Sequence, residues 1–227
     1  MPRTLNPVAH AVRRDEFLDA AQWLIQTKGY EQMSIQDILD RTEASRGALY
    51  HYFDSKAALL AAIVDRLVET ATAAVASVPE DPALSAREKF ARVFGGIARW
   101  KSERRDLMLA LVRVWYSDEN ALLRDKLRAQ MLVHLAPLVA RIVEQGRADG
   151  AFTVADAEET AHVILSLLYG AREAAGEMFF ARAEGAIPFA AVRRRFGAYS
   201  TAVERILGVP EGSLPIVDDA TLHEWFD

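Results

Sequence analysis

The segment SRGALYHYFDSKAALL, which runs from Ser45 to Leu60, places two tyrosines, a histidine and a phenylalanine in four consecutive positions. An aspartate, a serine and a lysine follow directly. Such a group of aromatic residues either packs between two helices or faces a binding partner. The segments on either side help to distinguish these two interpretations.

Two short helices separated by a tight turn are predicted around this segment. Ser34 suits the N-cap of the first, because its hydroxyl can bond the free backbone amide of Asp37, whose negative charge also suits a helix start. Ser45 caps the second in the same way, with Leu49 and Phe53 one turn apart on its inner side. Together with a longer helix before them, they have the sequence outline of a helix-turn-helix.

A helix-turn-helix lays its second helix in the major groove of DNA, where residues near its amino end meet the bases. Arg46 is suited to bonding guanine, with a phosphate contact as its competing role, and the Ala48 methyl is suited to touching thymine. Lys56 adds a positive charge at a helix start, where free amides favour anions. The predicted DNA-contacting residues are Ser34, Gln36, Ser45, Arg46, Gly47, Ala48, Tyr50, His51 and Lys56.

Several motifs across residues 13–67 occur together at characteristic distances. They are Ala20-Ala21 to Gly29-Tyr30, Ser34–Ile38, Leu49–Phe53, Ser55-Lys56 and Leu59-Leu60. In these motifs the chain resembles the TetR family of transcriptional regulators. The resemblance implies a DNA-binding amino-terminal domain, a divergent helical effector domain, a homodimer, and release from DNA when a small molecule binds.

The charge of the chain argues against a protein that coats nucleic acid by bulk charge, because its 227 residues carry a formal net charge of −5. Residues 1–56 contain seven basic and eight acidic residues. A DNA-binding face therefore requires segregation of charge within this region, together with neutral donors. His10, Arg13 and Arg14 form either an arm that touches DNA or a solvated, disordered terminus.

Helical periodicity extends through most of the remaining chain, after a break at Pro79 and Pro82. The fold class predicted is all-α. An amino-terminal three-helix helix-turn-helix domain over 1–56 precedes a larger helical ligand-binding and dimerisation domain over 57–207 and a carboxy-terminal tail over 208–227. Helices are predicted at about 13–28, from 34, from 45, from 55 to near 78, and at 85–101, 104–116, 119–146, 157–183 and 188–207.

Large aromatic residues and methionines in the second domain are, taken together, typical of an apolar ligand pocket, although for any one of them a place in the core is favoured. No cluster of arginines occurs among them, so we expect a small apolar or amphipathic effector rather than a highly anionic one. The predicted pocket residues are Trp100, Met108, Trp115, Met131, His134 and Tyr169.

A homodimer interface is predicted on the helices at about 157–183 and 188–207. Small apolar residues on the first of these helices would let a partner helix come close, and larger ones on the second would supply bulk. The predicted interface residues are Leu167, Gly170, Ala171, Ala174, Ala175, Met178, Phe196, Tyr199, Val203 and Ile206.

Other functional classes have little support in the sequence. The chain has no cysteine, which excludes disulfides and thiol chemistry. The single Glu159-x-x-His162 pair lacks the second such pair that a di-iron bundle needs. We therefore predict no metal, no cofactor and no enzymatic activity, with a helical-bundle metalloenzyme and a regulator without a small-molecule ligand as alternatives. The absence of a secretory signal and of an apolar run of roughly 18 residues predicts a soluble, cytoplasmic protein without a membrane partner.

Overall fold

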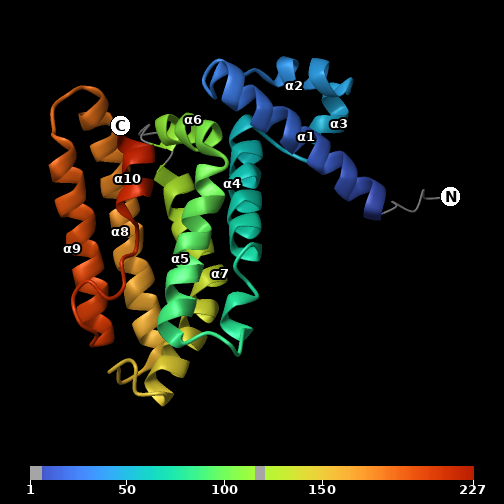
Figure 1. Cartoon of the computed structure of the whole chain (residues 1–227). Coiled ribbons are helices and arrows are strands. Elements are labelled where there is room, and N and C mark those ends of the chain that lie inside the picture. Colours follow the sequence, from blue (N-terminus) through green and yellow to red (C-terminus); the bar gives the residue numbers. More distant parts are fainter. Residues whose placement is uncertain (1–6, 116–120) are drawn as a thin grey trace. The chain divides into compact units, whose positions relative to one another are not determined.

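The structure of the chain, a computed structural model, describes residues 7–115 and 121–227, and all regular elements in these residues are helical (Figure 1). This confirms the predicted all-α fold. The helices are α1 (Pro7–Lys28), α2 (Ile35–Thr42), α3 (Arg46–Tyr50), α4 (Lys56–Ala73), the 3₁₀ turn η1 (Val78–Glu80), α5 (Ala86–Ser102), α6 (Arg105–Trp115), α7 (Ala121–Ala148), α8 (Ala157–Ala183), α9 (Phe189–Leu207) and α10 (Asp219–Phe226).

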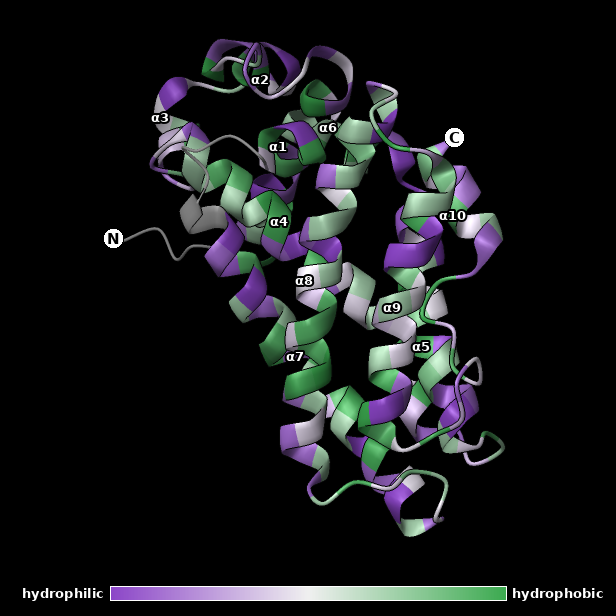
Figure 2. Cartoon of the chain, turned by 90° about the vertical axis from the view of Figure 1, so that its left-hand side faces the viewer, coloured by the Kyte–Doolittle hydropathy of each residue, from purple (hydrophilic) through white to green (hydrophobic). Residues whose placement is uncertain are grey.

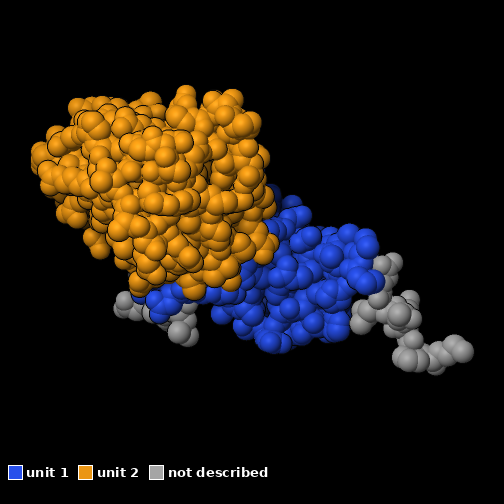
Figure 3. Space-filling view, turned by 90° about the horizontal axis from the view of Figure 1, so that it is seen from below, with its two compact units in different colours: residues 1–67, 104–127 blue, residues 68–103, 128–227 orange. Residues whose placement is uncertain are grey.

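Two compact units make up the chain (Figure 3). Unit 1 consists of residues 1–67 and 104–127, and unit 2 of residues 68–103 and 128–227. The helices α4 and α7 each contribute residues to both units. The two units are defined by how densely their residues contact one another, whereas the domain boundaries predicted after residues 56 and 207 separate functions. Those domain boundaries stay a prediction.

The core of unit 1 is built on α1. Its inward face repeats at helical spacing, and Phe17, Ala21 and Ile25 are fully buried. The helix packs against both α2 and α6. Ile38 of α2 and Leu49 of α3 are also fully buried, so both short helices are held by core side chains rather than by their own length.

The core of unit 2 collects the apolar faces of several long helices. Phe90 of α5, Val139 and Ile142 of α7, and Ile164 of α8 are almost completely buried in one cluster. Figure 2 shows apolar residues interleaved with polar ones along these helices, as expected for helices that bury one face only. The helices α8 and α9 lie side by side (Figure 1).

The carboxy-terminal tail contains a helix that the sequence analysis did not assign. The carboxylate of Asp218 accepts a hydrogen bond from the amide of Thr221 at 2.7 Å and so caps α10. Leu222 and Phe226 lie one turn apart and pack with Val192 of α9 in a second cluster. The cap and this spacing were visible in the sequence, but the helix is only eight residues long. Tertiary packing, not propensity, explains it.

Much of the surface predicted to form the dimer interface is buried within the single chain. Ala171 and Ala174 of α8 are buried within the chain, and Val203 of α9 is completely buried. Phe196 packs edge-on against Phe226 of α10, with ring centroids 5.8 Å apart. Residues of this set that are buried in the single chain are therefore not available to a second copy.

Candidate nucleic-acid interface

The turn between α2 and α3 is tight because one residue adopts the left-handed conformation. Glu43 has φ 48° and ψ 39°, and its amide donates to the carbonyl of Leu39. The amide of Ala44 also donates to that carbonyl, at 3.1 Å. Glutamate rarely adopts this conformation, so the sequence provided no signal for it. The turn brings the start of α3 directly after the end of α2.

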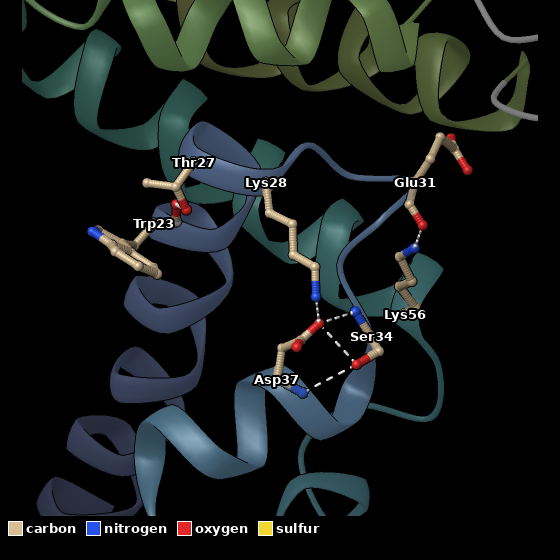
Figure 4. Close-up of polar contacts among 7 residues, drawn as sticks. All are labelled: Trp23, Thr27, Lys28, Glu31, Ser34, Asp37 and Lys56. Atoms are coloured by element: carbon tan, nitrogen blue, oxygen red, sulfur yellow. Dashed lines mark hydrogen bonds and ion pairs between the residues drawn. The ribbon is translucent and has the colours of Figure 1, made fainter.

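The start of α2 is closed by a capping box (Figure 4). Ser34 Oγ accepts from the amide of Asp37 at 3.1 Å, as predicted from the sequence. Asp37 Oδ2 in turn accepts from the amide and the hydroxyl of Ser34, at 2.7 Å and 2.8 Å. Because Asp37 occupies both donors of Ser34, a phosphate contact by this serine requires their rearrangement.

A cation from α1 completes this arrangement. Lys28 Nζ donates to Asp37 Oδ2 at 2.7 Å (Figure 4). The hydrogen bond from Lys28 lowers the pKa of Asp37 to about 2, with further contributions from the amide and hydroxyl of Ser34. The carboxylate is therefore ionised at neutral pH and joins the end of α1 to the start of α2.

The third helix is capped and anchored as the sequence analysis predicted. Ser45 Oγ accepts from the amide of Ala48 at 3.2 Å. Leu49 is fully buried and Phe53 is 4% exposed, so both point into the core. With one side of α3 held in this way, the opposite side is presented outward.

The outward side of α3 contains most of the residues predicted to read DNA. Arg46, Gly47, Tyr50 and His51 are all exposed, Tyr50 to 43% of its surface, and Ala48 is half-buried. A Cβ atom added to Gly47 would meet no atom of the chain within 4 Å. The fold itself therefore does not require glycine at this position.

The aromatic run from Tyr50 to Phe53 divides into two parts. The ring of Tyr52 packs 5.7 Å from that of Phe17 and 4.5 Å from that of His10. Phe53 is buried, whereas Tyr50 and His51 are exposed. The packing interpretation therefore holds for Tyr52 and Phe53, whereas contact of Tyr50 and His51 with a partner stays a prediction.

The remaining predicted contacts lie near α2 and the start of α4. Gln36 is exposed and donates to Asp40 at 2.7 Å. Lys56 Nζ donates to the carbonyl of Glu31 at 3.3 Å (Figure 4). It also lies 4.3 Å from the centroid of the Tyr30 ring. Lys56 therefore also anchors the connection between α1 and α2. The DNA-contacting role of all nine residues stays a prediction.

The structure assigns His10, Arg13 and Arg14 to α1, which begins at Pro7. They form neither a separate arm nor a disordered terminus. Arg13 donates to the carbonyl of Thr42 at 3.2 Å and pairs with Glu16. Arg14 lies over the ring of Phe53, 5.5 Å from its centroid. The helix begins at Pro7, earlier than the predicted start at about residue 13, because proline is well suited to the first position of a helix. Its missing N–H group would have no partner there.

The six residues predicted to line a ligand pocket are divided between the units. Met108 and Trp115 belong to unit 1, and Trp100, Met131, His134 and Tyr169 belong to unit 2. Trp100 and Tyr169 are 8% and 9% exposed, and His134 lies 3.0 Å from the side-chain oxygen of Gln130. The pocket itself stays a prediction.

Across residues 7–115 and 121–227, no group of three or more histidine, cysteine or acidic residues is arranged to hold a metal ion. Among the same residues, no helix combines the length and apolar character needed to cross a membrane.

Comparison with known proteins identifies relatives of this region. Residues 17–63 match the model of the bacterial regulatory proteins, tetR family. An uncharacterised HTH-type transcriptional regulator of Lactococcus lactis is 43% identical over 56 residues, which are 25% of this chain and 29% of that protein. The HTH-type transcriptional regulator EthR of Mycolicibacterium smegmatis is 36% identical over 90 residues, 37% of this chain and 42% of the relative. The chain thus covers less than half of these relatives.

Solved structures extend the likeness to the whole fold. The crystal structure of RolR in complex with resorcinol aligns over 96% of this chain and 95% of that one, with a TM-score of 0.61 and 17% identity. At this identity the likeness concerns the fold: a helix-turn-helix region followed by a helical domain. The relatives named above are transcriptional regulators by their descriptions.

Proposed function

We propose that the chain is a regulator of the TetR family, whose model its residues 17–63 match, and that it regulates transcription by binding double-stranded operator DNA. The observation that carries this proposal is the division of α3 into two sides. Leu49 holds the helix in the core, while Arg46, Gly47 and Tyr50 are exposed together on the other side. That is the arrangement by which a recognition helix enters the major groove. Such a protein acts in the cytoplasm, where bacterial DNA lies.

The active form is a homodimer, since two recognition helices must meet successive half-sites roughly 34 Å apart, or a multiple of that distance. The partner surface lies on the outward faces of α8 and α9. Val163 of α8 supports this assignment, because it is a large apolar residue with 53% of its surface exposed in the single chain. Val163→Arg should yield monomers that bind DNA poorly, whereas Ala155→Arg, at an exposed position before α8, should not.

The regulator is a repressor that a small apolar or amphipathic ligand releases from DNA. Aromatic residues and methionines of the helical domain supply the apolar walls of its pocket. The helix α4 carries the signal, since it runs unbroken from Lys56 in unit 1 to Ala73 in unit 2. Moving the equilibrium from mostly bound to mostly free requires a difference in ligand affinity of about 5.5 kcal/mol between the two conformations.

Selection of bound duplexes from a random DNA library tests the DNA-binding function directly. The purified chain should enrich a pseudo-palindromic sequence whose half-sites are about 10 base pairs apart or a multiple of that. Affinity for the enriched duplex is then measured for the parent and Arg46→Ala. No enrichment, or equal affinity of the two proteins at every salt concentration, would contradict the proposed recognition helix.

A further inference from the structure

The two histidines of unit 1, His10 and His51, lie beside each other although much of the unit separates them in the sequence. Their ring centroids are 5.7 Å apart, and the two rings meet edge to face. His10 lies at the start of α1, and His51 is the residue that ends α3. The fold therefore brings two imidazoles together at the carboxyl end of the proposed recognition helix.

One aromatic ring holds this pair of histidines in place. The centroid of the Tyr52 ring lies 4.5 Å from that of His10 and 5.3 Å from that of His51. Tyr52 in turn packs 5.7 Å from the ring of Phe17, which is fully buried. Both imidazoles are thus positioned by contact with the core of unit 1.

The polar atoms of the two imidazoles have no structural role in the described residues. Within residues 7–115 and 121–227, no hydrogen bond or ion pair joins the side chain of His10 or His51 to another residue. His51 is exposed and His10 is half-buried. Two ordered rings therefore present hydrogen-bonding nitrogens that a partner outside the chain can use.

The charged groups closest in sequence to the histidine pair are Arg13, Arg14 and Asp54. Arg13 pairs with Glu16, and Arg14 lies 5.5 Å from the centroid of the Phe53 ring. Asp54 is exposed and forms no ion pair with either histidine. No carboxylate of the described residues therefore neutralises the pair when both rings are protonated.

The other helices that contact α1 place their charges further along it. The contacts are Lys28 with Asp37 of α2, Trp23 with Arg41 of α2, and Asp19 with Arg66 of α4. Within the described part of the chain, the charged residues of α6 form no ion pair with α1; they are Arg105, Asp106 and Arg113. The start of α1 thus carries two imidazoles without an acidic neighbour across from them.

We propose that His10 and His51 together bind one phosphate of the operator backbone, and that DNA binding is coupled to their protonation. Two protonated rings this close repel each other unless an anion joins them, and a phosphate is such an anion. The N–H groups of charged imidazoles form strong hydrogen bonds with phosphate oxygens. The proposal rests on the DNA-binding function above and adds His10, which is not among the nine predicted contacts.

The charge of the DNA-binding region gives this contact a regulatory consequence. Residues 1–56 contain one acidic residue more than basic ones, and His10 and His51 are their only histidines. Protonation of both rings reverses that balance. Because histidine changes its charge between pH 5 and 8, operator affinity should rise as the pH falls through this range.

The pH dependence of operator affinity tests the proposal. The probe is the duplex enriched from the random library, labelled with a rhodamine dye, and its anisotropy is measured with the full-length protein. Parental affinity should be about tenfold or more higher at pH 6 than at pH 8. His10→Gln and His51→Gln keep a hydrogen-bond donor that cannot become charged, so each should lose much of this rise. His162→Gln removes a histidine of unit 2 and should keep it.

The salt dependence distinguishes a phosphate contact from an effect on folding. In the parent, the slope of log affinity against log salt should be steeper by about one at pH 6 than at pH 8, because one more phosphate is neutralised. In the double variant His10→Gln/His51→Gln, the slope should not change with pH. Thermal unfolding at both pH values checks that each variant is folded. If His10→Gln does not fold, His51→Gln, at an exposed position, decides the outcome alone.

Failure of this proposal and failure of DNA binding give different results. The phosphate site is overturned if the parent binds the operator equally well at pH 6 and pH 8. It is also overturned if the folded double variant, or His51→Gln where that variant decides alone, keeps the parental rise in affinity and the change in salt slope. Operator binding at pH 8 remains in each of these cases. If the chain enriches no duplex at all, the DNA-binding function is contradicted, and the phosphate site with it.

Discussion

The ammonium group of Lys28, the last residue of α1, donates a 2.7 Å hydrogen bond to the carboxylate of Asp37 in the first turn of α2. This contact joins the long scaffold helix of unit 1 to the helix that precedes the recognition helix. The same carboxylate closes the capping box with Ser34. One side chain therefore sets both where α2 begins and how it meets α1.

Acid should weaken unit 1 in a defined pH range because of Asp37. Its pKa in the folded chain is about 2, below the ordinary value of 3.8, chiefly through the hydrogen bond from Lys28. A depressed pKa means that the carboxylate contributes stability above pH 4, which is lost as the pH falls towards 2. In Asp37→Asn, this part of the acid dependence should be missing from unfolding curves followed by circular dichroism between pH 6 and 2. An unchanged acid dependence would contradict the role assigned to Asp37.

Gly47→Ala should separate folding from DNA binding. An added Cβ meets no atom of the chain within 4 Å, and alanine favours a helix over glycine by up to about 1 kcal/mol. Thermal stability should therefore stay equal or rise. Operator affinity should fall if the DNA backbone approaches this position closely, as measured by fluorescence anisotropy. A variant with parental affinity would show that DNA does not approach closely at residue 47.

Arg46→Ala and Lys56→Ala should both weaken DNA binding, but Arg46→Ala should also reduce sequence preference, whereas Lys56→Ala should not. Arg46 is exposed at the start of α3, so its removal should cost about 1–3 kcal/mol and relax the preference at particular base pairs. Lys56→Ala should instead weaken binding to all duplexes and reduce the salt slope by about one. Anisotropy titrations at several salt concentrations, with operator and mutated duplexes, distinguish the two patterns. If Arg46→Ala kept the parental preference for particular base pairs, Arg46 would contact only a phosphate.

Glu204→Gln should loosen the carboxy-terminal tail. Glu204 is 1% exposed, and its carboxylate accepts from the amides of Gly212 at 2.9 Å and Leu214 at 2.7 Å. In the variant, the NH₂ group of glutamine would meet one of these two backbone amides, so two hydrogen-bond donors would oppose each other. Such a mismatch costs about 1–3 kcal/mol at a buried site. Urea unfolding measures the change, and Glu184→Gln, at an exposed position, serves as the control. Equal stability of the two variants would contradict this anchoring role.

The sequence alone predicted features that depend on residues close together in the chain. Ser34 and Ser45 cap α2 and α3 as expected, because a cap needs only an acceptor and an amide three residues away. Leu49 and Phe53 are buried as expected, because helical spacing puts residues one turn apart on one side. These local rules were sufficient for the all-α fold and for the side of α3 that faces outward.

Contacts between distant segments required the tertiary structure. Arg128 of α7 and Arg172 of α8 both lie near the ring of Tyr169 because these helices pack together, and no spacing in the sequence reports that meeting. The eight-residue helix α10 is stabilised by Val192 of α9, which lies about thirty positions earlier. Local propensity and capping act within a few residues, whereas side-chain packing depends on where the whole chain returns to itself, and only the tertiary structure decides that.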